Sequence, residues 1–168
     1  MIHHISIAAH NPLNVAHVLA EIWNGQVFTF MPHPDAYLVV PHDEYGSGIE
    51  IYPLGDQLAP GSGQEPAQIV HQPNAGEWVA THAAVSVPAS ASQIKQIGDR
   101  EGWRVVVCDR SAFNVIEFWI ENRFMLELLT DEMAAQYLES TRQRQLVEQI
   151  FGAPLVRDRK VQQLVSTI

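Results

Sequence analysis

Two histidines and two glutamates recur in this sequence with matching spacing. His4 and Glu50 are 46 positions apart (50 − 4), and His82 and Glu127 are 45 positions apart (127 − 82). Two neutral imidazoles and two carboxylates form a nitrogen and oxygen donor set that suits Ni, Co, Fe, Mn or Zn better than Mg or Ca. The four residues are therefore a candidate metal site. An octahedral metal held in this way would keep two positions for water, which a substrate with adjacent oxygens can displace.

The neighbours of each candidate ligand alternate between apolar and polar residues, as in a half-buried strand. Both glutamates stand between aliphatic residues, in Ile49-Glu50-Ile51 and in Leu126-Glu127-Leu128, so each carboxylate points away from the face that its neighbours bury. Trp119 can also reach the space on that side. Residues that share strand parity with the four candidates are expected to form the wall of the same cavity: Ser6, Tyr52, Ala84, Ser86, Met125 and Leu129.

The elements that must position these residues fall into two sets of the same order. In the first set, residues 2–9 alternate as a strand, a helix follows from Asn11-Pro12 to Asn24-Gly25, and turn-forming residues separate three more strands: Gln26 to Phe30, Tyr37 to Pro41 and Gly48 to Tyr52. The second set begins with a strand from Trp78 to Val87 and a short helix that breaks at Gly102, followed by three strands: Trp103 to Val107, Phe113 to Ile120 and Phe124 to Leu129. Each set reads β-α-β-β-β, which indicates an internal duplication.

The expected fold class is α+β, with two βαβββ modules and a C-terminal helix. The first module covers residues 1–53 and the second covers 79–130, while the connection 54–78 is rich in Gly, Pro, Gln and Asn and has little periodicity. Residues 131–168 form the C-terminal helix and tail, with an apolar stripe of Met133, Tyr137, Leu138, Leu146 and Ile150. This helix has no counterpart in the first module, so we expect it to pack on the outside of a sheet or on a partner subunit.

The composition argues against several classes of protein. The chain has 168 residues, 46% of them hydrophobic, and a formal net charge of −9, which would repel the phosphate backbone of a nucleic acid. No apolar run approaches the roughly 20 residues of a membrane-spanning helix. The N-terminal residues lack the pattern of a signal peptide, so we expect a cytoplasmic protein with no membrane partner. Its single cysteine, Cys108, excludes an internal disulfide and a Cys-rich zinc site.

The duplicated His and Glu pairs resemble the ligand set of the vicinal oxygen chelate superfamily, also called the glyoxalase/bleomycin-resistance superfamily. The resemblance covers residues 2–130 and includes three further segments: Asn11-Pro12, Leu19 to Gly25 and Glu101-Gly102-Trp103. It implies a cupped mixed sheet around one divalent metal. It also implies a glyoxalase-type lyase or isomerase for a small molecule with vicinal oxygens, in which the metal stabilises an enediolate and Glu50 or Glu127 is the catalytic general base.

Other interpretations of the four residues remain open. The imidazoles can instead pair with the carboxylates, His4 with Glu127 and His82 with Glu50, in a metal-free small-molecule binding protein of the bleomycin-resistance type. Extradiol dioxygenases and the fosfomycin-modifying enzymes of the superfamily keep two His and one Glu, and a dioxygenase-like oxidoreductase would have no use for the fourth candidate. Each module alone is too small to bury its apolar face, so we expect a homodimer, with the metal ligands drawn from one chain or from two.

The remaining polar candidates have less specific environments. Glu117 stands in an otherwise apolar strand, so its carboxylate either has a partner or faces water at a sheet edge. His3 points to the opposite face of the sheet from His4. The other histidines are expected to be solvated residues of loops or of a helix: His10, His17, His33, His42 and His71.

Overall fold

The computed structural model describes residues 3–31, 33–59, 62, 66–74, 76, 79, 81–142 and 145. Its first half is a four-stranded mixed sheet with the strand order β1-β4-β3-β2, in which β1 and β4 are parallel. The elements of this half are β1 (His4–Ala9), α1 (Pro12–Trp23), β2 (Gln26–Thr29), β3 (Tyr37–Val40) and β4 (Gly48–Pro53).

The second half repeats this arrangement. Its sheet has the order β7-β10-β9-β8, again with a parallel pair between the first and last strands of the unit. The elements are β7 (Ala83–Ser86), α2 (Ala91–Glu101), β8 (Val105–Asp109), β9 (Asn114–Ile120) and β10 (Phe124–Leu129). The predicted α+β fold with two β-α-β-β-β units is therefore confirmed.

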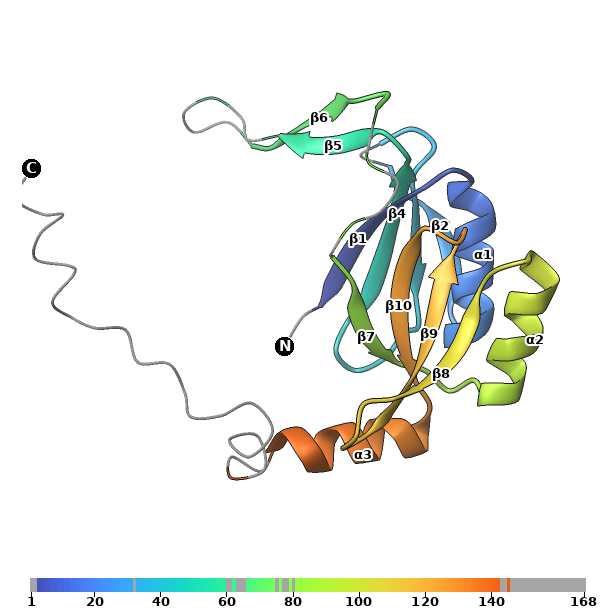
Figure 1. Cartoon of the computed structure of the whole chain (residues 1–168). Coiled ribbons are helices and arrows are strands. Elements are labelled where there is room, and N and C mark those ends of the chain that lie inside the picture. Colours follow the sequence, from blue (N-terminus) through green and yellow to red (C-terminus); the bar gives the residue numbers. More distant parts are fainter. Residues whose placement is uncertain are drawn as a thin grey trace, which may run out of the picture.

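Three further elements extend from the two sheets. The connection between the halves contains a hairpin of β5 (Asp56–Ala59) and β6 (Gln68–His71), which the sequence pattern does not predict. α3 (Asp131–Arg142) follows the second sheet. Figure 1 shows α1 and α2 on the same side of the sheets, with the hairpin at one end of the molecule and α3 at the other. The two sheets lie between these projecting elements.

The helices begin and end where their capping residues predict. The side chain of Asn11 accepts a hydrogen bond from the backbone of Asn14, and Pro12 occupies the first turn of α1, which ends at Asn24 with a left-handed φ of 50°. Ser90 and Gln93 form a capping box at the start of α2, which ends at Gly102 with φ 71°.

One hydrophobic core spans both halves. The aliphatic neighbours of the candidate glutamates are buried in it: Ile49, Ile51, Leu126 and Leu128 are each no more than 1% exposed. Because side chains alternate between the faces of a strand, Glu50 and Glu127 lie on the face away from this core. The core therefore determines which face of each sheet carries the polar candidates.

Polar contacts also join the halves. The turn between β9 and β10 contains Glu121 and Asn122, both at positive φ (52° and 56°). The carboxylate of Glu121 accepts hydrogen bonds from the backbone N–H groups of His10 and Asn11, over 2.6 and 2.8 Å, just before α1. Arg100 of α2 donates to Glu21 of α1 over 2.8 Å. These contacts fix the start of α1 and the helix pair against the second half.

Several predicted boundaries differ from the observed ones. The strand expected from Trp78 is shorter, because β7 begins at Ala83, and Trp78 lies outside the described residues. α3 is described as far as Arg142 and contacts the start of β9, where Tyr137 packs edge-on against Phe113 with 4.9 Å between ring centroids. The rest of the predicted helix, including Leu146 and Ile150, lies outside the described part. Among the described helices, none is long and apolar enough to cross a membrane.

Candidate metal centre

The two candidate glutamates occupy equivalent register positions in the two sheets. In the first half, Glu50 on β4 lies opposite Ser6 on β1, two residues after His4. In the second half, Glu127 on β10 lies opposite Ala84 on β7, two residues after His82. Each glutamate thus lies on the strand next to its histidine, at equivalent positions in the two units.

Side chains of β1 and β4 surround the Glu50 carboxylate. The hydroxyls of Ser6 and Tyr52 both donate to its Oε2, over 2.7 and 3.2 Å. Its Oε1 lies 3.8 Å from Nε2 of His4, whose side chain is 60% exposed while that of Glu50 is 16% exposed. Burial and the nearby Glu50 charge raise the pKa of Tyr52 above its ordinary value of 10.0, so this hydroxyl keeps its proton at neutral pH. Two hydroxyl donors therefore hold Oε2 in place and leave Oε1 on the side of His4.

The corresponding carboxylate of the second half, Glu127, is held by a guanidinium. Nη2 of Arg110 donates to Oε1 of Glu127 and to Oε1 of Glu117, over 2.9 Å in each case. Glu117 lies directly opposite Glu127 on β9. Two carboxylates in facing positions repel one another, and the positive guanidinium between them offsets this repulsion.

Hydrogen bonds within this second cluster shift the pKa values of Glu117 and Arg110 so that both stay charged. Burial raises the pKa of Glu117, but hydrogen bonds from Trp119 and Arg110 outweigh this effect and leave the pKa below its ordinary value of 4.5. Hydrogen bonds to Glu127 and Glu117 in turn raise the pKa of Arg110. Glu117 therefore has the partner that a carboxylate in an apolar strand requires.

Sequence reasoning missed Arg110, although a signal for it exists. By strand parity, Glu117 and Glu127 point to the same face, and facing carboxylates need a cation. Arg110 is the first basic residue after β8, in the turn that leads to the strand of Glu117. A search for the partner of Glu117 among the turn residues would have found it.

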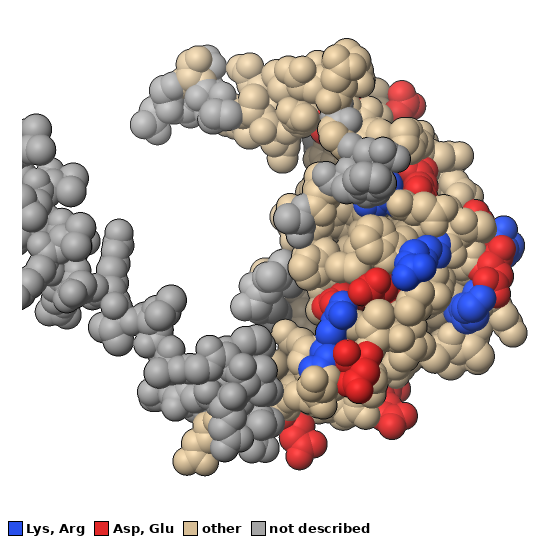
Figure 2. Space-filling view, viewed as in Figure 1, with Lys and Arg blue, Asp and Glu red and all other residues tan. Residues whose placement is uncertain are grey.

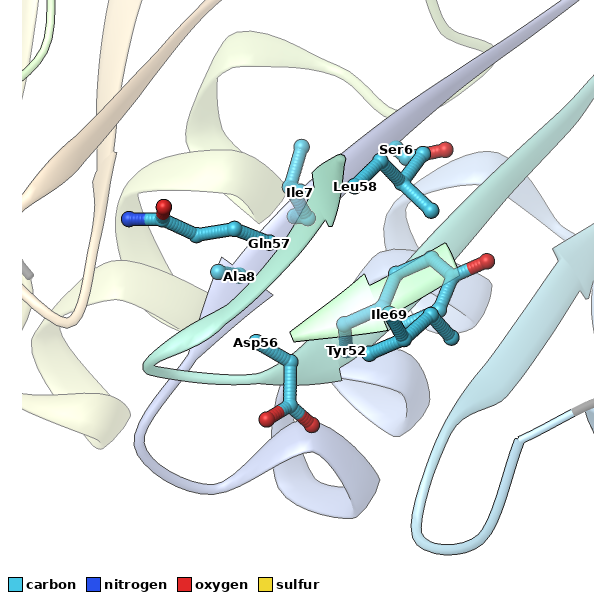
Figure 3. A pocket seen from close by; sticks show the side chains of 8 residues that line it. All are labelled: Ser6, Ile7, Ala8, Tyr52, Asp56, Gln57, Leu58 and Ile69. Atoms are coloured by element: carbon cyan, nitrogen blue, oxygen red, sulfur yellow. The ribbon is translucent and has the colours of Figure 1, made fainter. Parts of the chain in front are cut away.

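A cavity of about 200 Å³ lies between the hairpin and the first sheet. Figure 3 shows the side chains around it: Ser6, Ile7 and Ala8 from β1, Tyr52 from β4, and Asp56, Gln57, Leu58 and Ile69 from the hairpin. Ser6 and Tyr52 thus belong both to this cavity and to the hydrogen-bond network of Glu50. The volume lies below the roughly 300–1,000 Å³ of common ligand pockets.

A cluster of two histidines and one aspartate ties the hairpin to the first sheet. Nε2 of His33 lies 3.3 Å from Oδ2 of Asp56, and Nδ1 of His71 lies 2.7 Å from Oδ1. The His33 side chain is only 16% exposed and packs edge-on against Tyr52. The expectation that His33 is solvated is wrong, because the loop between β2 and β3 places it against the hairpin, a contact between distant segments.

The other residues expected at the wall of the metal site do not line the cavity beneath the hairpin, and their place at the metal site stays a prediction. Ala84 and Ser86 are exposed on β7, and Met125 of β10 lies opposite Trp119 of β9. Leu129, at the end of β10, is only 4% exposed. None of these five residues contributes to the cavity beneath the hairpin.

Within one chain, the four candidate ligands fit a divalent metal only in part. Within the described ranges, no group of three or more His, Cys, Asp or Glu side chains is arranged to hold a metal ion. His4 and Glu50 fit half of a metal centre, because Nε2 of His4 and Oε1 of Glu50 lie close together. The hydroxyls of Ser6 and Tyr52 hold the other oxygen of Glu50. Glu127 does not fit the other half, because Arg110 donates to its Oε1. His82, just before β7, is exposed. The convergence of all four ligands stays a prediction.

The viewed face of the molecule carries charged groups of both signs. Figure 2 shows acidic and basic side chains next to one another on the viewed face. Two of the described arginines, Arg100 and Arg110, each pair with two carboxylates. These two arginines are thus neutralised within the molecule, on a chain whose formal net charge is −9.

Comparison with known proteins identifies the fold. No protein-family model matches the sequence, and no curated protein matches it. Among solved structures, the monoclinic form of FosX, a fosfomycin resistance protein from Listeria monocytogenes, aligns over 83% of this chain and 96% of its own, with a TM-score of 0.53 and 14% identity. The chain has a glyoxalase-like fold. The expected resemblance to the vicinal oxygen chelate superfamily is therefore confirmed for the fold.

Two further solved structures align with this chain. A FosX variant from Listeria monocytogenes in complex with Mn(II) and 1S,2S-dihydroxypropylphosphonic acid aligns over 83% of this chain and 95% of its own, with a TM-score of 0.53 and 14% identity. A glyoxylase/bleomycin resistance protein/dioxygenase domain from Frankia sp. aligns over 76% and 94%, with a TM-score of 0.46 and 11% identity. At these identities the likeness concerns the fold alone, and the chemistry must be argued from the site.

Proposed function

We propose that the protein is a metal-dependent lyase or isomerase of the glyoxalase type, acting on a small molecule that binds the metal through vicinal oxygens. The observation that carries the proposal is the repeated register of His4 with Glu50 and of His82 with Glu127 on a glyoxalase-like fold. The donor types favour Ni, Co, Fe, Mn or Zn as the cofactor. A FosX structure of the same fold that holds Mn(II) with a molecule bearing adjacent hydroxyls supports this assignment.

The two pairs of ligands are proposed to meet across a homodimer. β1 and β7 stand at the ends of their strand orders, so each offers an edge to another strand. Within the described residues of a single chain, the candidates form no cluster of three metal-binding side chains. A second copy that places its β7 next to β1 would bring the second pair of one chain to the first pair of the other.

The residues around Glu50 prepare it for this role. A divalent ion would act as a Lewis acid on the oxygens of the substrate. Ser6 and Tyr52 hold Oε2 of Glu50, so that Oε1 stays on the side of His4. The adjoining cavity would receive the rest of the substrate. Glu50 and Glu127 are the two candidates for the base that removes a proton next to the substrate carbonyl.

Metal binding by the purified chain tests the proposal. Elemental analysis and calorimetric titration of protein purified without chelator are expected to give a stoichiometric divalent metal. The double variant His4→Ala, His82→Ala should lose at least about a hundredfold in affinity, because it removes both imidazole ligands. His17→Ala is the matched control, since His17 is an exposed histidine of α1. Absence of bound metal in the wild type after reconstitution would contradict the proposal.

A second candidate function is metal-free binding of a small, amphiphilic molecule. It is favoured by Arg110, which already neutralises Glu127, and by the apolar side chains of Leu58 and Ile69 over the cavity. A ligand that binds only the folded state raises the melting temperature. A thermal-shift screen with small aromatic and amphiphilic compounds therefore distinguishes the two functions: stabilisation by metals alone would eliminate the second.

A further inference from the structure

Two hydroxyl groups next to Glu50 form part of the wall of the cavity beneath the hairpin. Ser6 and Tyr52 line this cavity, and each donates its proton to Oε2 of Glu50, over 2.7 and 3.2 Å. A hydroxyl has one proton and two lone pairs. Because Glu50 accepts both protons, the oxygens of Ser6 and Tyr52 offer only lone pairs to a bound molecule. This part of the wall therefore accepts hydrogen bonds and does not donate them.

The charges near the cavity are negative. The described residues that line it include the carboxylate of Asp56, already the partner of two imidazoles, and no Lys, Arg or His. The Glu50 side chain is 16% exposed, and its ion-pair partner in the described part of the chain is the exposed imidazole of His4, at 3.8 Å. Its equivalent Glu127 is instead neutralised by Arg110. Among the described residues, Glu50 thus has no lysine or arginine partner.

The rest of the cavity wall is largely apolar. Leu58 of β5 lies opposite Ile69 of β6, and both line the cavity (Figure 3). Ile7 and Ala8 of β1 contribute apolar surface from the first sheet. Leu58 is 62% exposed and Ile69 is 37% exposed, so a bound molecule would remove apolar surface from water. The cavity therefore combines apolar side chains with acceptor oxygens next to a carboxylate.

We propose that this cavity binds a small organic ammonium ion. The N–H groups of the ion donate to the oxygens of Ser6 and Tyr52, and its apolar part lies against the hairpin. The inference rests on the second candidate function, because it names the class of molecule that the metal-free protein takes. An ammonium group has three donors and no acceptor, which matches oxygens that can only accept. Glu50 attracts the positive charge, and partial burial strengthens this attraction.

Calorimetric titration of the full-length protein with three probes of similar shape tests the proposal. Benzylamine, which is protonated at neutral pH, benzyl alcohol and benzoate share a benzene ring and differ in charge. A chelator is present throughout, so that metal ions take no part. The benzylammonium ion should bind roughly tenfold more tightly than benzyl alcohol, because hydrogen bonds from a charged donor are stronger. Benzoate should bind most weakly, because Glu50 repels it.

Glu50→Gln tests the role of the charge, because it removes the charge and keeps the size of the side chain. Its affinity for benzylammonium should fall roughly tenfold and approach that for benzyl alcohol. The matched control is Glu101→Gln on α2, because Glu101 is 17% exposed and also accepts two side-chain hydrogen bonds, from Arg100 and Asn14. The affinities of this control should stay within about twofold of the wild type, because Glu101 does not line the cavity and its charge is screened.

Leu58→Ala and Val70→Ala test the location of the site. Leu58 lines the cavity, whereas Val70 follows Ile69 on β6 and points to the other face of the hairpin. Both residues are exposed, so neither substitution removes a side chain from the core. Leu58→Ala should weaken the binding of benzylammonium and benzyl alcohol several-fold, because it removes apolar contact with the ring. Val70→Ala should leave both affinities within about twofold of the wild type.

The outcomes separate this inference from the second candidate function. A preference for benzylammonium that Glu50→Gln abolishes, with weaker binding to Leu58→Ala, supports the inference. Equal or tighter binding of benzyl alcohol or benzoate, a preference that persists in Glu50→Gln, or unchanged binding to Leu58→Ala overturns the inference and leaves metal-free binding standing. Absence of binding by all three probes overturns both in this cavity. Should Glu50→Gln fail to fold, the order of the three affinities in the wild type and in Leu58→Ala decides the result.

Discussion

At the scale of single residues, the two candidate carboxylates have equivalent places in the fold and different partners. Glu50 accepts hydrogen bonds from the hydroxyls of Ser6 and Tyr52, and Glu127 accepts one from Arg110. Neutral hydroxyls orient a carboxylate without cancelling its charge, whereas a guanidinium cancels it. The first carboxylate is thus ready for an added cation, while the second already has one. This difference makes the first half the stronger part of the candidate centre.

The titration of Tyr52 reports directly on the Glu50 network. Because burial and the Glu50 charge raise the pKa of Tyr52, the ultraviolet difference between wild type and Tyr52→Phe should reveal a phenol that ionises above pH 10.0. A raised pKa in the folded state stabilises the fold fully below pH 10.0, and this contribution is lost as the pH rises through the folded value. In Glu50→Gln the pKa should fall. A Tyr52 phenol that titrates at its ordinary pH would exclude the buried contact with Glu50.

At the scale of elements, the helices and strands meet through a few close contacts. Glu121 adopts positive φ in the β9–β10 turn and caps the backbone before α1, so a tight turn in one half anchors a helix of the other.

α2 packs on β8 at Gly98, which is buried. A Cβ atom at Gly98 would overlap Cγ2 of Val105 and lie 3.3 Å from the carbonyl oxygen of Trp103. The close approach of Gly98 to Val105 and Trp103 sets the distance between α2 and the second sheet.

Gly98→Ala should therefore destabilise the protein. In an exposed helix this substitution favours folding by about 1 kcal/mol. Here the stiff Val105 side chain cannot move aside, so we expect a loss of about 1–3 kcal/mol in the free energy of unfolding. Urea denaturation of Gly98→Ala, of Val105→Ala and of the double variant measures it. The double variant should recover part of the loss, and a stabilised Gly98→Ala protein would contradict the packing of α2 on β8.

At the scale of the whole molecule, the hairpin and α3 project at opposite ends of the two sheets, on the side away from α1 and α2 (Figure 1). The hairpin also presents apolar residues to solvent: Leu58 is 62% exposed and Ile69 and Val70 are 37% exposed. A contiguous patch of exposed apolar residues is typical of a surface that meets another chain. The proposed homodimer would cover this surface and unite the two pairs of candidate ligands.

A mixed dimer tests whether the ligands come from two chains. One chain would carry His4→Ala with Glu50→Gln, and the other His82→Ala with Glu127→Gln. If each site combines the first pair of one chain with the second pair of the other, a dimer purified through two different tags has one intact site and binds about one metal ion, whereas either pure dimer binds none. A mixed dimer without metal would instead assign all four ligands to a single chain.

The order of elements and the identity of the candidate ligands could be predicted from the sequence, because both depend on local rules. Strand alternation, the caps at Asn11 and Ser90, and the matched environments of the two glutamates are properties of short segments. The hairpin escaped prediction because its strands are short, mostly exposed and paired through the backbone, which leaves little hydrophobic pattern.

Only the tertiary structure decided which partners the candidate residues have. The guanidinium between Glu117 and Glu127, the Ser6 hydroxyl on Glu50, and the contact of His33 with Asp56 all join residues of different elements. Periodicity determines the face on which a side chain lies, but the contacts across strands and turns depend on how the chain packs as a whole. For this protein, the amino-acid sequence by itself determined a duplicated fold with two His and Glu pairs. Packing decided that one carboxylate is oriented by hydroxyls and the other is neutralised by an arginine.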